Sequence, residues 1–408
     1  MDGSIIVGID IGSTKICTLV ARLEEDERMR ILGVGIEPSK GIRKGAVVDL
    51  AAASQAITRS IDKAERTSGL EINSALVSLA GSHVEAMNST GVVAISGRPI
   101  EDDDVLRAME AAQAVAIPHN REIIHVIQRN FTVDGQEGVR TPVGMHAYRL
   151  EVETHIITAS ISTVENLRQC VGASGVEVTQ FVLNPLASAE VVLSDTEREM
   201  GVVVCDMGGG TTDLAIYIEG DVWHTAVLAV GGSHITSDIA HGLRLAMDQA
   251  EDVKRKHGHA NQETVPQDEF FTVRPFGEGE AYDVLRKDLA HIIGARTEEI
   301  FSMTLQEIKR SGYDGLLPAG VVLTGGASAL PGVREVAAEV LNLPVRVAQP
   351  KNLLGMIDQI NSPAYSTSVG LLRWAALMNE IAFMPGRRRL NLGLNWERVQ
   401  EFLRRLLP

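Results

Sequence analysis

The chain has 408 residues, and its 38 Lys and Arg against 53 Asp and Glu give a formal net charge of −15. At about 150 residues per domain, this length predicts two or three domains, each large enough to bury a core. The composition, 45% hydrophobic and 22% charged, excludes wholesale disorder. The acidic balance argues against non-specific nucleic-acid binding, which needs a positive surface, so no nucleic-acid partner is expected.

Cysteine content and hydropathy set the expected compartment. Cys17, Cys170 and Cys205 are too few for a disulfide framework and favour a reduced cytosolic environment. No signal peptide is expected, because the N-terminus has neither a charged leader nor a long apolar core. No window approaches the ~18 continuous apolar residues of a membrane-spanning helix.

A strand, a polar turn and a second strand open the chain. Residues 5–9 and 16–21 are short apolar runs, and the turn between them predicts a hairpin. The turn contains Asp10, Gly12, Ser13, Thr14 and Lys15. A helix is expected over 49–68, where apolar residues recur at three or four positions, and a buried strand over 74–80.

Residues 83–161 predict a small mixed domain. Strands are expected at 92–95 and 122–133, and Asp102 is the predicted cap of a helix that runs to Ala116. At 149–158 the alternation of apolar and polar residues has the period of two that is typical of a half-exposed strand. Its exposed face is predicted to carry Arg149, Glu151, Glu153 and His155.

The opening pattern returns about 196 residues later. An apolar run at 201–205 leads into a second polar turn, and another strand follows at 214–218. The turn holds Asp206, Gly208, Gly209, Gly210, Thr211 and Thr212. Superposing Asp10 on Asp206 aligns strand, D-x-G turn and strand, which predicts an internal duplication. Residues 234–310 are predicted to be mainly helical, and a buried strand at 321–323 meets Gly325, Gly326 and Ala327.

Both turns have the composition of phosphate-binding loops. Glycine lets backbone N–H groups approach a phosphate, hydroxyls and a lysine add donors, and an adjacent Asp can hold Mg²⁺ through water. One such turn alone is as readily a structural hairpin turn, but two of the same pattern favour a phosphate site. Neither turn has the P-loop pattern and no G-x-G-x-x-G follows the first strand, so P-loop and Rossmann sites are excluded.

The paired D-x-G hairpins resemble the actin, sugar-kinase and DnaK-type chaperone superfamily, in which two related α/β domains hold ATP and Mg²⁺ between them. The resemblance implies that the two turns bind phosphate, with Asp10 and Asp206 at the metal. It implies further nucleotide contacts at Gly231, Gly232, Glu251, Lys254, Gly325, Gly326 and Ala327. Glu190 matches the position that orients the attacking water in actins. The alternative for Glu190, Glu251 and Lys254 is a solvated helix face.

Longer stretches resemble the FtsA family of actin-like bacterial cell-division proteins nearly from end to end. They are residues 7–17, 41–45, 142–145, 155–158, 184–189 and 230–240. The Gly-Ile-Arg-Lys-Gly of 41–45 and the Pro-Val-Gly-Met of 142–145 are more specific than the phosphate loops. A pilus-assembly relative of FtsA shares the insertion, so the insertion does not separate those two.

The resemblance implies an α/β fold of duplicated actin-like ATPase domains around a nucleotide cleft, with a small inserted α+β domain and a C-terminal amphipathic helix. The first actin-like domain is expected at 1–82, 162–195 and 352–382, and the inserted domain at 83–161. The second is expected at 196–230 and 315–351, with a helical subdomain at 231–314. A basic linker at 383–394 and a membrane-targeting helix at 395–408 complete the chain.

The C-terminal segment has a charge opposite to that of the rest. From residue 386 onward six arginines face two glutamates, a net charge of +4, so the remainder carries −19. At ~100° per residue, one face of a helix over 395–407 collects Trp396, Val399, Phe402, Leu403, Leu406 and Leu407. Arg404 and Arg405 lie off that face, and this pattern suits an anionic lipid surface. A terminal helix packed on the body is the alternative.

Membership of the FtsA family would make the protein a non-enzymatic adaptor with at most weak ATPase activity. It would polymerise like actin, anchor the tubulin-like FtsZ to the cytoplasmic face of the cell membrane at the septum, and recruit later division proteins through the inserted domain. The resemblance places the FtsZ C-terminal tail at Arg296 and Glu299, which otherwise read as a surface ion pair. A sugar or acetate kinase is the enzymatic alternative, and the pilus-assembly adaptor is a third.

Overall fold

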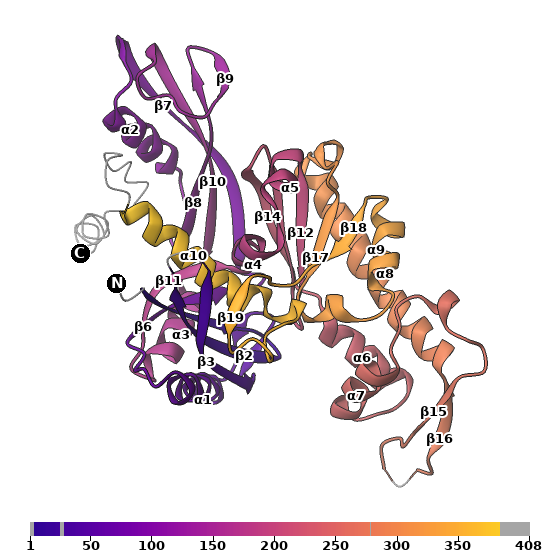
Figure 1. Cartoon of the computed structure of the whole chain (residues 1–408). Helices are drawn as coiled ribbons and strands as arrows, with labels where there is room; N and C mark the ends of the chain where they lie inside the picture. Colours follow the sequence, from indigo (N-terminus) through magenta and orange to yellow (C-terminus); the bar gives the residue numbers. More distant parts are fainter. Residues whose placement is uncertain (1–3, 25–27, 278, 384–408) are drawn as a thin grey trace.

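Two β-sheets that share one strand order dominate the fold. The computed structural model describes residues 4–24, 28–277 and 279–383. The first contains β1 (Ile5–Ile11), β2 (Lys15–Leu23), β3 (Met29–Pro38), β6 (Ser74–Leu79), β11 (Glu177–Leu183) and β19 (Leu353–Gly355). The second contains β12 (Val202–Met207), β13 (Thr212–Ile218), β14 (Asp221–Leu228), β17 (Val321–Thr324) and β18 (Val345–Val347). Figure 1 shows the two sheets side by side.

The two sheets repeat one topology. In the order β3-β2-β1-β6-β11, the first three strands are antiparallel and the last two run parallel to β1, and β14-β13-β12-β17-β18 follows the same plan. Strand β19 is an addition beside β3. In the strand register Asp10 of β1 lies opposite Cys17 of β2, and Asp206 of β12 lies opposite Asp213 of β13. Each aspartate is the last residue but one of its strand. The predicted duplication is therefore confirmed.

Helices cover both faces of the first sheet. On one face lie α1 (Leu50–Ser68) and α3 (Ile161–Gly172), and on the other lie α4 (Asn184–Val192) and α10 (Ser366–Phe383). The side chain of Asp49 caps α1 by accepting a hydrogen bond from the Ala52 N–H at 3.0 Å. The predicted stripe of α1 is buried from Ala53 to Ala64, but Leu50 in the first turn is exposed. Both faces of this sheet thus contribute to the core.

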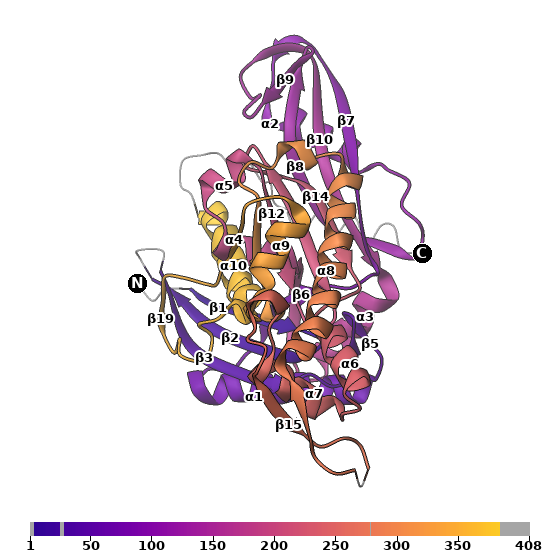
Figure 2. The same cartoon turned by 90° about the vertical axis from the view of Figure 1, so that its right-hand side faces the viewer.

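The second sheet is followed by a helical region. It contains α6 (Gly232–Gly242), α7 (Met247–His257), α8 (Arg286–Ser311) and α9 (Val333–Leu341), whereas α5 (Asp195–Met200) precedes β12 and packs on β13. A hairpin of β15 (Phe270–Val273) and β16 (Tyr282–Leu285) interrupts the helices that the sequence predicts between 234 and 310. Figure 2 shows α8 running along this half, with the hairpin at its far end. The four-residue strands are too short for a clear alternation of apolar and polar residues, so the sequence does not indicate the hairpin.

The inserted domain projects from the opposite end of the molecule (Figure 1). It has the strand order β7-β10-β8-β9 and one helix. The elements are β7 (Val84–Pro99), α2 (Asp102–Gln113), β8 (Arg121–Val133), β9 (Gln136–Val139) and β10 (His146–Ser160). Glu101, not the predicted Asp102, is the N-cap of α2, and the helix ends at Gln113 rather than Ala116. Strand β7 is far longer than the predicted 92–95.

The prediction of a half-exposed strand holds for only part of β10. Glu153 is exposed, but His155 on the same face is buried, and Ile156, Ile157 and Thr158 are buried in succession. Toward its end the strand packs against β14 of the second sheet, where Thr225 contacts His155. Burial on both faces removes the alternation that the sequence suggested.

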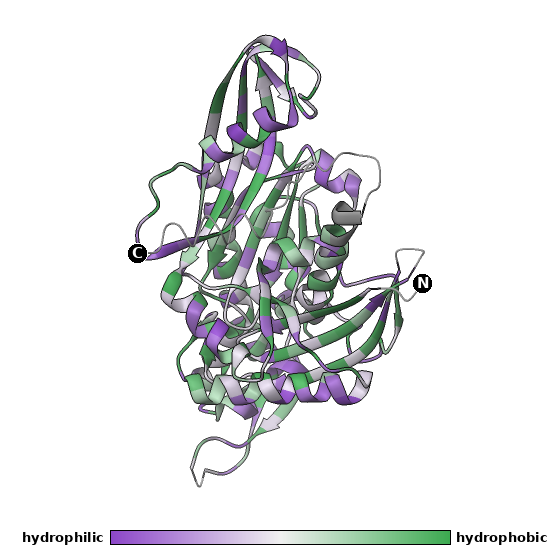
Figure 3. Cartoon of the chain, turned by 90° about the vertical axis from the view of Figure 1, so that its left-hand side faces the viewer, coloured by the Kyte–Doolittle hydropathy of each residue, from purple (hydrophilic) through white to green (hydrophobic). Residues whose placement is uncertain are grey.

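Hydrophobic residues concentrate on the strands of the two large sheets, whereas hydrophilic residues are frequent on the outer helices (Figure 3). Among the described residues, no helix combines the length and the apolar character that crossing a bilayer requires. The linker and the amphipathic helix predicted toward the C-terminus fall on residues 384–408, outside the described part of the chain.

Candidate functional site

The first predicted loop follows β1. The turn is closed by a hydrogen bond from the Gly12 N–H to the Lys15 carbonyl at 3.0 Å. Lys15 Nζ lies 3.2 Å from Asp10 Oδ2, and the Ser78 hydroxyl donates to Asp10 Oδ1 at 3.1 Å. Burial alone would lower the pKa of Lys15, but the charges of Asp10 and Cys17 and the hydrogen bond to Asp10 together raise this pKa above its ordinary value. Lys15 is therefore a permanent cation beside a buried carboxylate.

The second loop repeats this turn after β12. The Gly208 N–H donates to the Thr211 carbonyl at 2.9 Å, as Gly12 does to Lys15. The Thr211 hydroxyl donates to Asp213 Oδ2 at 2.8 Å, and the Thr212 hydroxyl donates to the Val230 carbonyl at 2.8 Å. These side-chain bonds fix the conformation of the loop.

The two loops are in direct contact. A Cβ added at Gly209 would lie 2.3 Å from Thr14 Cγ2, and one at Gly210 would lie 2.4 Å from Ser13 Oγ. Both separations are shorter than non-bonded carbon and oxygen atoms allow, so a side chain at either glycine would require Thr14, Ser13 or a loop to move. The structure thus brings together the two turns that the sequence separates by almost two hundred residues.

The other predicted glycines converge on the second loop. The N–H groups of Gly232 and Ser233, at the start of α6, donate to the carbonyls of Gly208 and Gly209 at 2.9 and 2.8 Å. Gly325 has a φ of +83°, and a Cβ there would lie 2.3 Å from Asp206 Oδ1. On the same side, a Cβ at Gly232 would lie 3.1 Å from that of Ala327, while Gly231 packs on the loop carbonyls and Gly326 faces Ala364.

Glu251 and Lys254 of α7 belong to one hydrogen-bonded cluster. Lys254 Nζ donates to Glu251 Oε2 at 2.6 Å, to Thr236 Oγ1 at 2.7 Å and to the Gly232 carbonyl at 3.1 Å. Arg255 contacts the other oxygen of Glu251 at 2.9 Å. The pair therefore connects α7 to the glycine turn at the start of α6 rather than forming a solvated face.

Three buried carboxylates gather at the loops. Burial raises the pKa of Asp206 to about 6, with the Thr367 hydrogen bond opposing and the charge of Asp10 adding to the rise. Burial and the charge of Asp206 raise the pKa of Asp213 well above its usual range. Asp213 Oδ1 is buried and has no hydrogen-bond partner among the described residues. Uncompensated buried oxygens are costly, so the site fits a cation.

The donor set also limits how a cation would be held. No group of three or more His, Cys, Asp and Glu side chains in the described residues could chelate a metal. Mg²⁺ commonly keeps several waters and takes one or two carboxylates together with substrate phosphates. Asp10 and Asp206 are the residues that would face such an ion, and the ion would supply charge neutralisation between carboxylate and phosphate.

Sequence reasoning missed the hydroxyls that hold these carboxylates. Thr367 Oγ1 donates to Asp206 Oδ2 and Ser368 Oγ donates to Asp10 Oδ2, each at 2.7 Å. The preceding Ser366 shares a 2.6 Å hydrogen bond with Thr324. The one available signal was three consecutive hydroxyl residues at the start of a helix, a common pattern that gives no indication of its partners.

The structure does not bring Glu190 to the loops. Ser188 lies close enough to Asp206 to lower its pKa, and two residues along α4 is a rotation of ~200°, so Glu190 points the other way. The Glu190 carboxylate pairs with Arg198 at 3.1 Å. Arg198 covers the ring of Tyr217. Tyr217 lies five residues along β13 from Thr212 of the second loop, a distance of ~17 Å. Glu190 borders a separate cavity of about 680 Å³. The expectation of a water-orienting role is therefore corrected.

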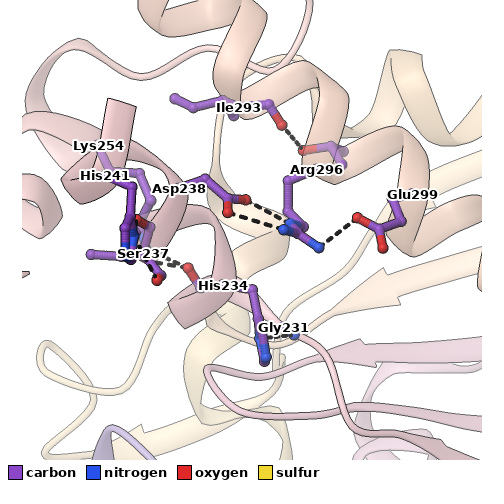
Figure 4. Close-up of polar contacts among 12 residues, drawn as sticks. Gly231, His234, Ser237, Asp238, His241, Lys254, Ile293, Arg296 and Glu299 are labelled. Carbon is purple, nitrogen blue, oxygen red and sulfur yellow. Dashed lines mark hydrogen bonds and ion pairs between the residues drawn. The ribbon is translucent and has the colours of Figure 1, made fainter. Parts of the chain in front are cut away.

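Arg296 and Glu299 lie on α8 and are paired, as the surface reading predicts, but the pair has a third member. Arg296 donates from Nε and Nη2 to the two oxygens of Asp238 at 2.6 and 3.0 Å, and from Nη1 to Glu299 (Figure 4). Asp238 belongs to α6, the helix that begins at the glycine turn. The cluster thus presents a partly exposed carboxylate and a guanidinium on one surface.

Comparison with known families decides the classification. A family model described as "Cell division protein FtsA" matches residues 203–370, and one described as "SHS2 domain inserted in FTSA" matches residues 81–158. The chain belongs to the FtsA family. It is 41% identical to the cell division protein FtsA of Pseudomonas aeruginosa over 91% of this chain and 89% of that protein. The FtsA of Bacillus subtilis is 38% identical over 98% of this chain and 89% of that protein. The FtsA of Escherichia coli K12 is 34% identical over 99% of this chain and 98% of that protein.

Solved structures place the fold among the actin-like proteins. The chain is similar to a structure of the PilM–PilN type IV pilus biogenesis complex, with a TM-score of 0.63 and 15% identity over 91% of this chain and 98% of that one. MreB5 of Spiroplasma citri bound to ADP gives a TM-score of 0.57 and 14% identity over 93% and 99%. The predicted fold class is confirmed, and the FtsA relatives establish a role in cell division.

Proposed function

We propose that this FtsA-family protein binds ATP with Mg²⁺ between its two loops. The observation that carries the proposal is the contact of two glycine-rich turns, each beside a buried aspartate, at the junction of two sheets of equal topology. The MreB5 structure described as bound to ADP has the same fold, which supports a nucleotide here.

Different residues are assigned to the phosphates, the metal and the nucleoside. Backbone N–H groups within the two turns, other than those of Gly12 and Gly208 that close the turns, contact the phosphates, and Lys15 supplies a positive charge. Asp10 and Asp206 hold water-coordinated Mg²⁺. The turns at Gly231 and Gly325, with Glu251 and Lys254, border the nucleoside, because all of them lie on the same side of the second loop.

The protein acts as an adaptor rather than as an enzyme, with at most weak ATPase activity. Arg296 and Glu299 receive the C-terminal tail of FtsZ, and the residues after 383 attach the protein to anionic lipid on the cytoplasmic side of the cell membrane at the septum. Self-association into actin-like filaments would multiply weak single attachments into avidity. Later division proteins bind the inserted domain, whose outer end projects from the body (Figure 1).

Two measurements test this proposal. Calorimetric titration with ATP, with Mg²⁺ and with EDTA, should show binding that the metal strengthens, and absence of binding in both conditions would contradict the nucleotide site. Sedimentation with FtsZ and anionic vesicles should show both partners in one pellet for the full chain. A chain that ends at residue 394 should still bind FtsZ but leave the vesicles, and retention on vesicles would contradict the tail anchor.

A further inference from the structure

The start of α10 lies between the two sheets, in contact with the ends of β1, β12 and β17. Its first residues, Ser366, Thr367 and Ser368, are buried, and each hydroxyl has a partner on a different strand or loop. Ser366 contacts Thr324 at the end of β17, Thr367 contacts Asp206 at the end of β12, and Ser368 contacts Asp10 at the end of β1. One helix terminus thus touches both sheets.

Two adjacent residues therefore hold the two carboxylates of the proposed metal site. Thr367 and Ser368 are consecutive, so their Cα atoms are ~3.8 Å apart and cannot separate. Each donates a 2.7 Å hydrogen bond to the Oδ2 atom of one aspartate, a length typical of a hydroxyl on a charged acceptor. The spacing of the hydroxyls consequently limits the spacing of the carboxylates.

The backbone supports this arrangement from the other side. The Gly325 N–H donates to the Pro363 carbonyl at 3.0 Å, which ties the segment before α10 to the turn that faces Asp206. Behind its first turn, α10 packs with Val369 and Leu372 in the core of the first sheet and with Leu371 in a core that includes Ala187 of α4. The hydroxyls therefore stand on a rigid, fully packed helix rather than on a loop.

We propose that Thr367 and Ser368 are positioning residues for the metal-bound nucleotide, in that their hydroxyls set the distance and orientation of Asp206 and Asp10 across the two halves. This inference rests on the proposed function. The cost of holding two desolvated carboxylates near one another is high without donors, and these two hydroxyls supply one donor to each. A rotation of one half against the other would have to break one of the two bonds or move α10.

The hydroxyls and the loops are expected to affect ATP binding in different ways. Backbone N–H groups of the loops contact phosphate with or without a metal, whereas the aspartates act on the nucleotide only through the metal. Loss of a hydroxyl at Thr367 or Ser368 should therefore reduce the gain in ATP affinity that Mg²⁺ produces and leave the affinity in EDTA close to that of the parent. Damage to the fold would reduce both affinities together.

The test compares Thr367→Val, Ser368→Ala and Thr367→Ser with the parent, and measures the dissociation constant of ATP in Mg²⁺ and in EDTA. We expect the ratio of the two constants to fall about tenfold in Thr367→Val and in Ser368→Ala, the loss of one hydrogen bond to a charged group, and to recover in Thr367→Ser. Thr304→Val is the matched control, because Thr304 is equally buried but donates to the Ile300 carbonyl within α8.

The outcomes separate the possible failures. An unchanged ratio in both Thr367→Val and Ser368→Ala overturns the inference, as does an equal loss of affinity in Mg²⁺ and EDTA. If Thr367→Val does not fold, Ser368→Ala decides alone, since it removes one oxygen from the side chain and keeps its Cβ. A parent that binds no ATP in either condition would instead contradict the proposed function. The melting temperature of each ligand-free variant shows whether it is folded.

Discussion

Arg296 and Asp238 form an ion pair with two hydrogen bonds between α8 and α6, at 2.6 and 3.0 Å. The contact connects the proposed partner surface to the helix whose first N–H groups bind the second phosphate loop. The Arg296 side chain is about one quarter exposed, so its guanidinium can donate to an additional carboxylate of a partner while it stays bonded to Asp238. Its hydrogen bond and charge contacts with Asp238 raise the pKa of Arg296, which remains a cation throughout the physiological range.

Reversal of this charge, Arg296→Glu, should weaken binding of an FtsZ C-terminal peptide by roughly tenfold or more, because a like charge replaces a donor. ATP affinity should stay within about twofold, since the loops do not contact the residue. Arg310→Glu is the matched control, because Arg310 pairs with Glu307 on the same helix. Fluorescence anisotropy of a labelled peptide measures the effect, and equal affinity of variant and parent would place the docking surface elsewhere.

Replacement of either aspartate by alanine should weaken ATP binding in Mg²⁺. Asp10→Ala and Asp206→Ala each remove an acceptor for the hydrated cation, while the phosphates keep their repulsion. A loss of about tenfold or more corresponds to one charged hydrogen-bonding group. Calorimetric titration measures it, and unchanged affinity in both variants would remove the phosphate-loop assignment.

Gly209→Ala should crowd the contact between the two loops. Its Cβ would lie 2.3 Å from Thr14 Cγ2, so the Thr14 side chain or one loop must move, at a cost of about 1–3 kcal/mol in the free energy of unfolding. Gly172→Ala is the matched control, because a Cβ there meets nothing within 4 Å. Urea denaturation without nucleotide measures both variants. Equal stability of Gly209→Ala and Gly172→Ala would show that the loops are not in contact.

Stability should fall as the pH is lowered below about 6.5, partly because of His155. Burial, with the charges of His224 and Arg129, lowers the pKa of His155 to about 3. Its Nδ1 lies 2.7 Å from Asn88 Oδ1 and its Nε2 lies 2.9 Å from Thr225 Oγ1, an arrangement that suits the neutral ring with one donor and one acceptor. The unfolded chain binds a proton below its ordinary value of 6.5 and the folded chain does not, so stability rises with pH between about 3 and 6.5.

The variant His155→Gln should flatten this dependence, because glutamine cannot titrate. We expect the difference in unfolding free energy between pH 7 and pH 5 to shrink by about 1–2 kcal/mol relative to the parent. Urea denaturation at the two pH values measures it. His119→Gln, on the exposed segment before β8, is the control and should change nothing. A parent and variant with equal pH dependence would contradict a buried neutral imidazole.

A carboxylate on the apolar face of the predicted tail helix should release the protein from membranes. Trp396→Glu and Phe402→Glu each place a charge where lipid contact is expected, at a cost of several kcal/mol. High salt should weaken the parent only in part, because the apolar contribution is not screened. Vesicle flotation at low and high salt measures this. If the variants float with the vesicles, or the parent does not, the membrane anchor is contradicted.

The sequence by itself determined the local chemistry of the site. A D-x-G turn between two strands is formed by neighbouring residues alone. Asp10 and Asp206, their glycines and the duplication were therefore visible as short sequence patterns. The register of each strand pair then follows from its hairpin. The tight turns at Gly12 and Gly208 close within four residues. Such features are fixed by backbone geometry close in the chain.

Only the tertiary structure decided which side chains meet. Ser368 bonds to Asp10 from 358 residues away, and no local pattern encodes that contact. Glu190 lies on a helix that does reach the site, yet its rotation about the helix axis turns it toward Arg198. His155 has the sequence position of an exposed strand residue but is buried against β14. In each case the packing of distant elements sets the surroundings of the side chain, and that packing is a property of the whole chain.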